Sequence, residues 1–287
     1  MPEKLVINFC PTGMVEKSKL TQEVPLSPER IIEDVHAANE LGITIAHLHA
    51  RSESDQAPSH RVEDFYKIFE GVRKHCPELI ISATLSGRSV SDWTLRSEVI
   101  SLLPDMGSLT LSSLNFSQGA SINAPDTIKS LANAMNENGV VPELECFDLG
   151  MINYGKYLIK KGLLKGPLYW NLLFGNIAGT QGDPMSIGAL TREVPEGSII
   201  SLAGIGNTQL PVNATAIALG YGVRVGLEDN LWFDSERKRA ATNTQLIQRI
   251  HQLAEIHERT IMSPAELGGR GFYNRQYHNE ARVHTPQ

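Results

Sequence analysis

Cysteine, aromatic residues and long apolar runs are all scarce in this chain. Its three cysteines, Cys10, Cys76 and Cys146, include no C-x-x-C pair, which argues against a disulfide framework and favours a reducing compartment, the cytoplasm. No stretch approaches the roughly 18 uninterrupted apolar residues of a membrane span. The apolar run near the N-terminus is too short for a signal peptide. A membrane location is therefore not expected.

The chain also has no excess of basic over acidic residues. The net charge of −6 and the pI of about 5.9 argue against nucleic acid or an anionic membrane as a partner, because both attract basic patches. With 287 residues, 41% of them hydrophobic, the chain is long enough for a large core and has a length usual for one α/β barrel.

Strand-like and helix-like segments alternate along the whole chain. The first unit pairs a strand at 5–9 with a helix at 27–42, which has Ser27 as its N-cap and ends at Gly42. The last pairs a strand at 222–229 with a helix at 242–259. Eight such units predict one (β/α)₈ TIM barrel domain over 1–287, with a C-terminal extension from about 260. A doubly wound open sheet is the alternative, and the tail at 269–287 is either an arm on a neighbouring subunit or partly disordered.

Polar side chains fall on one face of several predicted strands. Side chains alternate along a strand, and the polar face should point into the barrel and towards the C-terminal strand ends, where barrel active sites lie. The residues on this face are His47, His49 and Arg51; Ser82, Thr84 and Ser86; Ser108, Thr110 and Ser112; Glu143 and Glu145; Arg224 and Glu228. A serine in one barrel layer is ordinary, but five strands agree and buried charges need partners. We therefore predict a polar site at the barrel mouth.

The stretch HLHAR, residues 47–51, suggests a metal site. Residues two apart on a strand face the same way, so His47 and His49 could converge on one ion. Glu228 is the best third ligand, with Glu145 and Asp229 as rivals. Two histidines and a carboxylate suit catalytic zinc, and manganese or iron would also accept them. Paired histidines also occur as satisfied polar core, so spacing alone leaves both interpretations open.

Charged residues around this cluster have two interpretations each. Arg51 and Arg224 either neutralise a neighbouring carboxylate or bind a substrate carboxylate. Asp229 follows Glu228 and should point away from it, although the turn leaving the strand could swing it into the pocket as a base.

Two glycine-containing turns follow predicted strands, Pro11–Gly13 after the first and Ala203–Asn207 after the seventh. Loops after the seventh strand often bind an anion in this fold. The candidate substrate-binding residues are Ser86, Ser108, Thr110, Arg51, Gly204 and Gly206. Cys10 and Cys146 are interpreted as packing residues.

Motifs along nearly the whole chain resemble one known family. They are PTGM (11–14), HLHAR (47–51), PSHR (58–61), SGR (86–88), SLNF (113–116), VPELE (141–145), AGIG (203–206) and RVGLEDN (224–230). Together they are similar to the β-keto acid cleavage enzymes, zinc-dependent (β/α)₈ barrels that condense a β-keto acid with acetyl-CoA to give acetoacetate and an acyl-CoA.

The resemblance implies roles for individual residues. His47, His49 and Glu228 would hold Zn²⁺, which would polarise the keto acid. Asp229 would act as the base, assisted by Arg224 and the hydroxyl of Thr84, and Glu145 would line the pocket. Family members are typically homotetramers.

Departures from the family bear on the substrate. The lysine-fermentation branch has an acidic residue where this chain has Val15, followed by Glu16, and a small S-T-G-G type turn where this chain reads TLSGR. It has an asparagine in place of Thr110. These positions line the substrate's variable end, so the departures argue against 5-amino-3-oxohexanoate as the substrate.

Other functions remain as alternatives. A divalent-metal aldolase or CoA-ester lyase also places H-x-H at a barrel mouth. A zinc amidohydrolase would want H-x-H on the first strand and histidines on the fifth and sixth, where this sequence has none. A non-catalytic small-molecule binder would keep the pocket without needing a metal.

Overall fold

Eight parallel strands close into a barrel. The computed structural model describes residues 3–15 and 20–283, so Glu16 and the last four residues lie outside the described part. The barrel strands are β1 (Ile7–Phe9), β2 (Ile45–Leu48), β5 (Ile80–Ala83), β6 (Met106–Thr110), β9 (Val141–Cys146), β10 (Tyr169–Phe174), β11 (Ile199–Gly204) and β12 (Gly222–Val225). β12 pairs back onto β1, Asn8 opposite Arg224, so the predicted (β/α)₈ barrel is confirmed and an open sheet is excluded.

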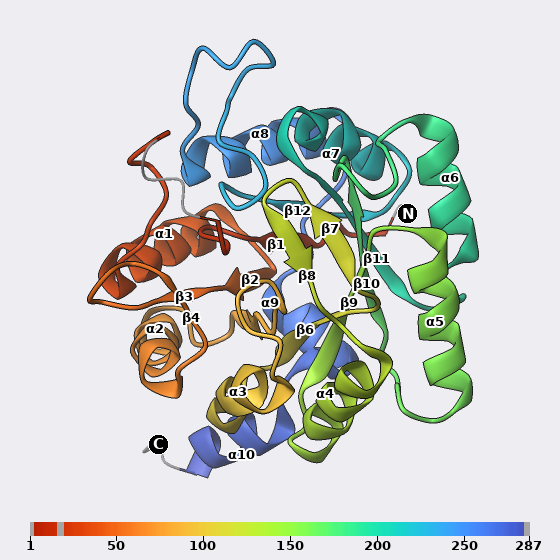
Figure 1. The fold of residues 1–287 in the computed structure, drawn as a ribbon. Coiled ribbons are helices and arrows are strands. Elements are labelled where there is room, and N and C mark those ends of the chain that lie inside the picture. Colours follow the sequence, from red (N-terminus) through yellow and green to blue (C-terminus); the bar gives the residue numbers. More distant parts are fainter. Residues whose placement is uncertain (1–2, 16–19, 284–287) are drawn as a thin grey trace.

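Helices surround this barrel (Figure 1). They are α1 (Pro28–Leu41), α2 (Val62–His75), α3 (Trp93–Ser97), α4 (Pro125–Glu137), α5 (Leu149–Lys160), α6 (Pro184–Glu193), α7 (Gln209–Ala218) and α8 (Asn243–Ile256). The predicted start of α1 is confirmed, because Ser27 accepts a hydrogen bond from the Arg30 amide and Gly42 adopts φ 92° as the C-cap. α3 is a short helix and continues as a 3₁₀ segment, η1 (Glu98–Leu102). No helix in the described ranges is long and apolar enough to cross a membrane.

Two small hairpins interrupt the βα pattern and were not predicted. One joins β3 (Ala50–Arg51) to β4 (Pro58–Ser59), and the other joins β7 (Leu114–Phe116) to β8 (Gly119–Ser121). Each follows a barrel strand at its C-terminal end, so both stand at the mouth of the barrel. The 3₁₀ segment η2 (Gly206–Thr208) leads from β11 into α7 at the same end.

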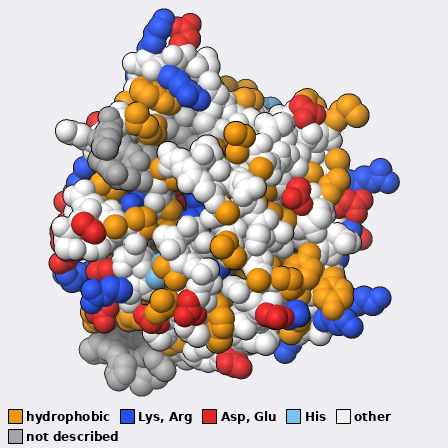
Figure 2. Space-filling view, in the orientation of Figure 1, with side chains coloured by type: hydrophobic (Ala, Val, Ile, Leu, Met, Phe, Trp, Pro, Cys, Tyr) orange, Lys and Arg blue, Asp and Glu red, His pale blue; other side chains and the backbone are white. Residues whose placement is uncertain are grey.

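The barrel wall separates an apolar outer layer from a polar interior. Alternate strand residues such as Leu48, Leu144 and Leu202 pack outward in the core shared with the helices. His47, Ser82 and Glu143 are buried on the opposite, inner face and bond to one another. The predicted inward direction of this polar face is confirmed. On the surface facing the viewer in Figure 2, charges of both signs are interspersed around the edge.

The N-terminal end of the barrel is closed by apolar side chains of the strands and of the C-terminal segment. This segment comprises α9 (Pro264–Leu267), a π-type turn η3 (Gly268–Phe272) and α10 (Arg275–Val283). The cluster contains Val6, Ile45, Ile80, Met106, Val141, Tyr169, Met262, Leu267 and Phe272. Asn274 is fully buried and donates hydrogen bonds to the carbonyls of Pro104 and Asn138. The segment through α10 therefore packs on the barrel of its own chain. From the sequence, an arm that packs on a neighbouring subunit had been one of two possibilities.

Candidate active site

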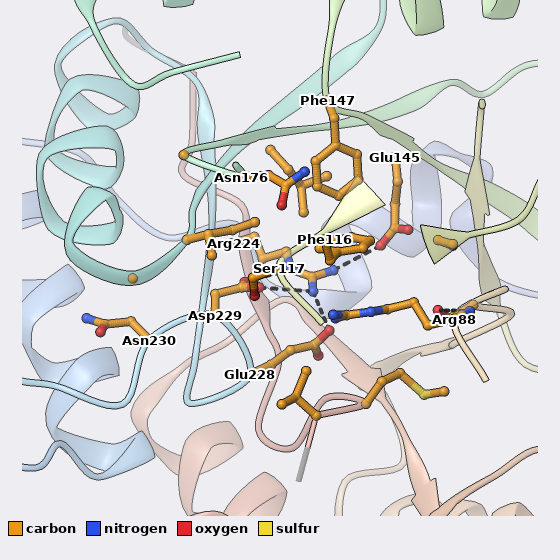
Figure 3. Close-up of a pocket in the computed structure, with 18 of the residues that line it drawn as sticks. Arg88, Phe116, Ser117, Glu145, Phe147, Asn176, Arg224, Glu228, Asp229 and Asn230 are labelled. Atoms are coloured by element: carbon orange, nitrogen blue, oxygen red, sulfur yellow. Dashed lines mark hydrogen bonds and ion pairs between the residues drawn. The ribbon is translucent and has the colours of Figure 1, made fainter. Parts of the chain in front are cut away.

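A cavity of about 410 Å³ opens at the C-terminal ends of the barrel strands. Its lining includes the polar residues His47, His49, Glu145 and Arg224. It also includes apolar rings such as Phe116 and Phe147 (Figure 3). The β7–β8 hairpin contributes Phe116 to the rim. The cavity lies where barrel enzymes build their active sites.

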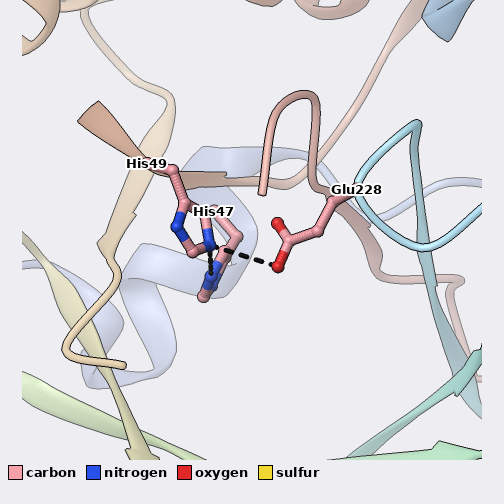
Figure 4. Close-up of side chains that lie close together, drawn as sticks. All are labelled: His47, His49 and Glu228. Carbon is pink, nitrogen blue, oxygen red and sulfur yellow. Dashed lines mark hydrogen bonds and ion pairs between the residues drawn. The ribbon is translucent and has the colours of Figure 1, made fainter. Parts of the chain in front are cut away.

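His47, His49 and Glu228 converge at the floor of this cavity (Figure 4). The Nε2 atoms of the two histidines are 3.2 Å apart, and Nε2 of His49 is 3.1 Å from Oε1 of Glu228. Ligand atoms about 2.1 Å from a tetrahedral zinc ion lie roughly 3.4 Å from one another. Two of the three donor–donor distances are therefore close to the spacing that such an ion requires, and all three donor atoms lie within 4.8 Å of one another.

Two close backbone approaches bring Glu228 to the histidines. At Gly226, with φ 156°, an added Cβ would lie 2.0 Å from the Cys10 carbonyl oxygen. At Gly13, with φ 73°, an added Cβ would lie 2.6 Å from Cγ of Glu228. The glycines therefore let the ends of β1 and β12 press together, which fixes where the Glu228 side chain lies.

The protonation states of His49 and Glu228 suit metal ligation, whereas at His47 the Glu143 carboxylate overcomes the effect of burial and raises the pKa. Burial lowers the pKa of His49 to about 4, so its imidazole is neutral at physiological pH. Burial alone would raise the pKa of Glu228, but Arg224 and the two histidines hold it well below its usual value. Neutral imidazole and ionised carboxylate are the forms that bind zinc.

Glu143 lies beneath the cluster and orients His47. Its Oε2 is 2.8 Å from Nδ1 of His47 and accepts a hydrogen bond of 2.6 Å from the Ser82 hydroxyl. Its Oε1 accepts hydrogen bonds from the amides of Asn8 and Asn171. Burial opposes ionisation, yet the interactions with His47, Arg224 and Ser82 together outweigh it and lower the pKa of Glu143 to about 2. Such carboxylate–histidine pairs fix the imidazole so that Nε2 faces a metal.

The role of Glu143 escaped the sequence analysis, which placed it on the polar face but assigned it no function. The E-L-E alternation at 143–145 was the available signal. It could not show that Glu143 lies below the histidines while Glu145 reaches the cavity, because that depends on the tilt of the strands.

Arg224 forms its closest ion pairs with three carboxylates of the cavity lining (Figure 3), and Glu143 lies 3.8 Å from the same guanidinium. Its Nε lies 2.9 Å from Oδ2 of Asp229, and its two terminal nitrogens lie 2.7 Å from Glu228 and 3.2 Å from Glu145. Thr110 donates a hydrogen bond of 2.8 Å to Glu145. The acidic groups outnumber this cation, which favours a divalent metal ion in the same space.

Asp229 reaches the cavity although it directly follows Glu228. The amides of Asp229 and Asn230 both donate to the Gly226 carbonyl, so the chain turns immediately after β12 instead of remaining extended. This turn brings both carboxylates to the cavity. Cys10, interpreted from the sequence as a packing residue, is buried and also donates a hydrogen bond of 3.2 Å to Asp229.

The candidate substrate-binding residues divide into two groups. Ser86, Thr110 and Gly206 line the cavity, as does Thr84. The described lining does not include Ser108, Arg51 or Gly204.

Structural contacts account for the residues outside the lining. The Ser108 hydroxyl accepts a hydrogen bond from the Leu85 amide. The Arg51 guanidinium donates to the carbonyl oxygens of Gly13, Val15 and Gln56, so it holds the loop after β1. At Gly204 an added Cβ would lie 2.4 Å from the carbonyl oxygen of Thr208. In this structure the three residues shape the loops that border the cavity.

The sequence matches a known family over most of its length. Residues 4–269 match the profile of the beta-keto acid cleavage enzymes. The chain belongs to this family. The resemblance inferred from the motifs is confirmed, and with it the predicted enzyme class, an acyltransferase that cleaves a carbon–carbon bond of a keto acid.

Two curated relatives cover nearly the full chain. The 3-keto-5-aminohexanoate cleavage enzyme of Fusobacterium nucleatum subsp. nucleatum is 33% identical over 267 residues, which is 93% of this chain and 97% of that protein. The 3-oxoadipate:acetyl-CoA acetyltransferase of Cupriavidus necator is 32% identical over 270 residues, which is 93% of this chain and 94% of that protein. Among solved structures, a binary complex of ObcA with oxaloacetate matches with a TM-score of 0.73 at 20% identity, covering 88% of this chain and 68% of that one. This structural match supports the barrel fold.

Proposed function

We propose that this chain is a zinc-dependent β-keto acid cleavage enzyme that uses acetyl-CoA as its co-substrate. The overall reaction converts a β-keto acid and acetyl-CoA into acetoacetate and the CoA ester of the remaining acyl group. The observation that carries the proposal is the convergence of two imidazoles and one carboxylate beside the Asp229–Arg224 pair. Family membership and the names of the two relatives support the reaction type.

The residues at the cavity floor fit a zinc ion. His47, His49 and Glu228 would hold it through two nitrogen donors and one oxygen donor. The two histidine Nε2 atoms are 3.2 Å apart, and Nε2 of His49 is 3.1 Å from Oε1 of Glu228. Three protein ligands leave a further position for substrate, as in catalytic zinc sites. Bound zinc would supply Lewis acidity to the oxygen atoms of the β-keto acid.

Asp229 is proposed as the base. It takes a proton from C2 of the β-keto acid, and the resulting carbanion attacks the thioester carbonyl of acetyl-CoA, which releases CoA thiolate. The thiolate then attacks the original C3 carbonyl, the C2–C3 bond breaks, and the proton returns from Asp229 to C2 of the departing acetoacetate. Atoms and charges balance without another reactant.

Neighbouring side chains support these steps. Arg224 holds Asp229 and Glu228 apart and in place through separate nitrogens. The hydroxyls of Thr84, Ser86 and Thr110 line the cavity and are proposed to bind substrate oxygens. Burial raises the pKa of Glu145, which is proposed to line the same pocket next to the reacting atoms.

A cytoplasmic homotetramer is proposed as the working form. Its three cysteines are buried free thiols, in keeping with a reducing compartment. Several large apolar side chains are exposed on the outer helices, among them Met185, Ile256 and Tyr157, and a subunit contact would cover such residues. Light scattering on the purified protein measures the assembly: a tetramer supports the proposal, and a monomer at micromolar concentration contradicts it.

The activity test uses purified protein, acetyl-CoA and a panel of β-keto acids, with acetoacetate as the measured product. The wild type should form acetoacetate, and His49→Ala should lose that activity together with its zinc. His36→Ala removes a partly exposed histidine of α1 and serves as the matched control. Release of CoA without acetoacetate would instead indicate an aldolase or CoA-ester lyase, and zinc-free binding without turnover would indicate a binding protein.

A further inference from the structure

Arg88 is a cation at the mouth of the active-site cavity. It follows β5 in the turn Ser86–Arg88 and reaches into the cavity in Figure 3. Its guanidinium carbon lies 3.8 Å from the centre of the Phe116 ring, which belongs to the β7–β8 hairpin at the rim. Arg88 also borders a shallow depression next to the cavity, together with Met14 and Val15. It therefore lies in the wall between the cavity and its outer edge.

Buried hydrogen bonds hold the turn that carries Arg88 in place. Arg96, which is 1% exposed, donates hydrogen bonds to the carbonyls of Leu85 and Ile122 and to the side chain of Asn123. These bonds tie the end of β5 to the end of β8. At Gly87, an added Cβ would lie 2.5 Å from the Ile122 carbonyl oxygen. The scaffold therefore fixes the place from which the Arg88 side chain extends.

The Arg88 guanidinium has no acceptor within the described residues. No ion pair joins it to a carboxylate of residues 3–15 or 20–283, although Arg224 and Arg96 in the same region are fully bonded. Its face lies against Phe116, and Phe116 is supported edge-on by Phe147 at 5.6 Å. Stacking uses the face of a guanidinium and leaves its in-plane N–H groups available for a planar anion.

Partial burial disfavours the charged form of the Arg88 guanidinium when no anion is bound to it. Removal from water lowers the pKa of Arg88, with Glu228 acting in the opposite direction. A carboxylate of the ligand would offset this loss of solvation and accept two parallel hydrogen bonds.

The surroundings indicate which end of a substrate would meet Arg88. The reacting end belongs at the cavity floor, beside the proposed zinc ligands and Asp229. Arg88 lies within electrostatic range of Glu228, but it also borders on Met14, Val15 and Phe116, and Met14 and Val15 line the outer depression as well as the cavity. Apolar contacts there suit a methylene chain, and the cation suits an anionic group at its end.

We propose that Arg88 makes this chain select β-keto acids that carry a second carboxylate at the far end, and that its guanidinium binds that carboxylate. The proposal rests on the function proposed above and names the substrate class of that site.

The test compares matched pairs of acids with equal carbon number, each assayed with acetyl-CoA for acetoacetate. The pairs are 3-oxoglutarate with 3-oxopentanoate, 3-oxoadipate with 3-oxohexanoate, and 3-oxopimelate with 3-oxoheptanoate. For the best-fitting length, kcat/KM should favour the dicarboxylate by about tenfold or more, the size expected for a charge-assisted pair.

Variants assign this preference to Arg88. Arg88→Met should abolish the preference, and Arg88→Lys should retain part of it because the charge remains while the planar fork is lost. Val15→Glu, which adds a carboxylate beside Arg88, should reduce the preference without altering Arg88 itself. Arg237→Met is the matched control, since Arg237 borders the cavity but hydrogen-bonds to Asn207; it should leave the ratio unchanged.

Three results would overturn the inference. Equal kcat/KM values of the wild type for both members of every pair would show that the enzyme does not select dicarboxylates. An equal loss on both members in Arg88→Met means that Arg88 binds the reacting carboxylate. A rise in KM for acetyl-CoA alone means that it binds a phosphate of the coenzyme. Absence of turnover with every acid, by contrast, counts against the proposed function itself.

Discussion

Nδ1 of His47 lies 2.8 Å from Oε2 of Glu143, deep inside the barrel and below the candidate metal site. Both side chains are at most 1% exposed. This contact leaves Nε2 of His47 directed at His49 and at the cavity floor. The geometry of the site therefore depends on a residue that touches no substrate.

Glu143→Gln tests that dependence. Glutamine keeps the shape but removes the charge that orients and polarises His47, so zinc affinity should fall by about 10–100-fold. Titration with a competing chelator measures it. Glu137→Gln, at the exposed end of α4, is the control. Unchanged zinc affinity in Glu143→Gln would show that the contact does not hold the ligand in place.

Asp229→Asn separates catalysis from metal binding. Asp229 is not one of the three converging ligand residues, so the variant should keep its zinc. Loss of the base should lower kcat by about 10²–10⁴-fold. Steady-state kinetics combined with metal analysis measures both quantities. A variant that loses zinc as readily as His49→Ala would instead make Asp229 a ligand.

Gly13→Ala should displace Glu228. An added Cβ would lie 2.6 Å from Cγ of Glu228, and φ is 73°. Gly162→Ala is a close control, because φ is 71° there and an added Cβ meets nothing within 4 Å. Both variants should lose about 1–2 kcal/mol of stability from the left-handed backbone, but zinc should be lost from Gly13→Ala alone. Equal zinc content in the two variants would remove the proposed role of the close approach.

Phe272→Ala tests the apolar closure at the opposite end of the barrel. Phe272 is 1% exposed and packs edge-on against Tyr169, with ring centres 6.4 Å apart. Truncation should lower the free energy of unfolding by about 3–5 kcal/mol. Urea denaturation measures the change, with Leu219→Ala at a position 55% exposed as the control. A loss as small as that of the control would mean that the segment contributes little to the barrel.

Local patterns in the sequence were sufficient for much of the fold and for part of the site. Strand alternation placed His47 and His49 on one inner face, and repeated βα units predicted the closed barrel. Helix signals such as Ser27 and Gly42 marked ends that the structure confirms. These features depend on neighbouring residues, which a single sequence contains.

Features that depend on distant contacts could not be read in this way. The position of Glu143 under His47 follows from strand tilt and register around the barrel. The turn that brings Asp229 into the cavity was only one possibility, and the hairpin carrying Phe116 was missed. The C-terminal closure depends on Asn274 meeting carbonyl groups more than a hundred residues away.

The most direct test of the account measures zinc content and turnover on the same preparation. The protein should contain about one zinc per subunit and form acetoacetate from a β-keto acid and acetyl-CoA. That activity should be lost on metal removal and recovered when zinc is returned. Full cleavage activity in metal-free protein would contradict this account.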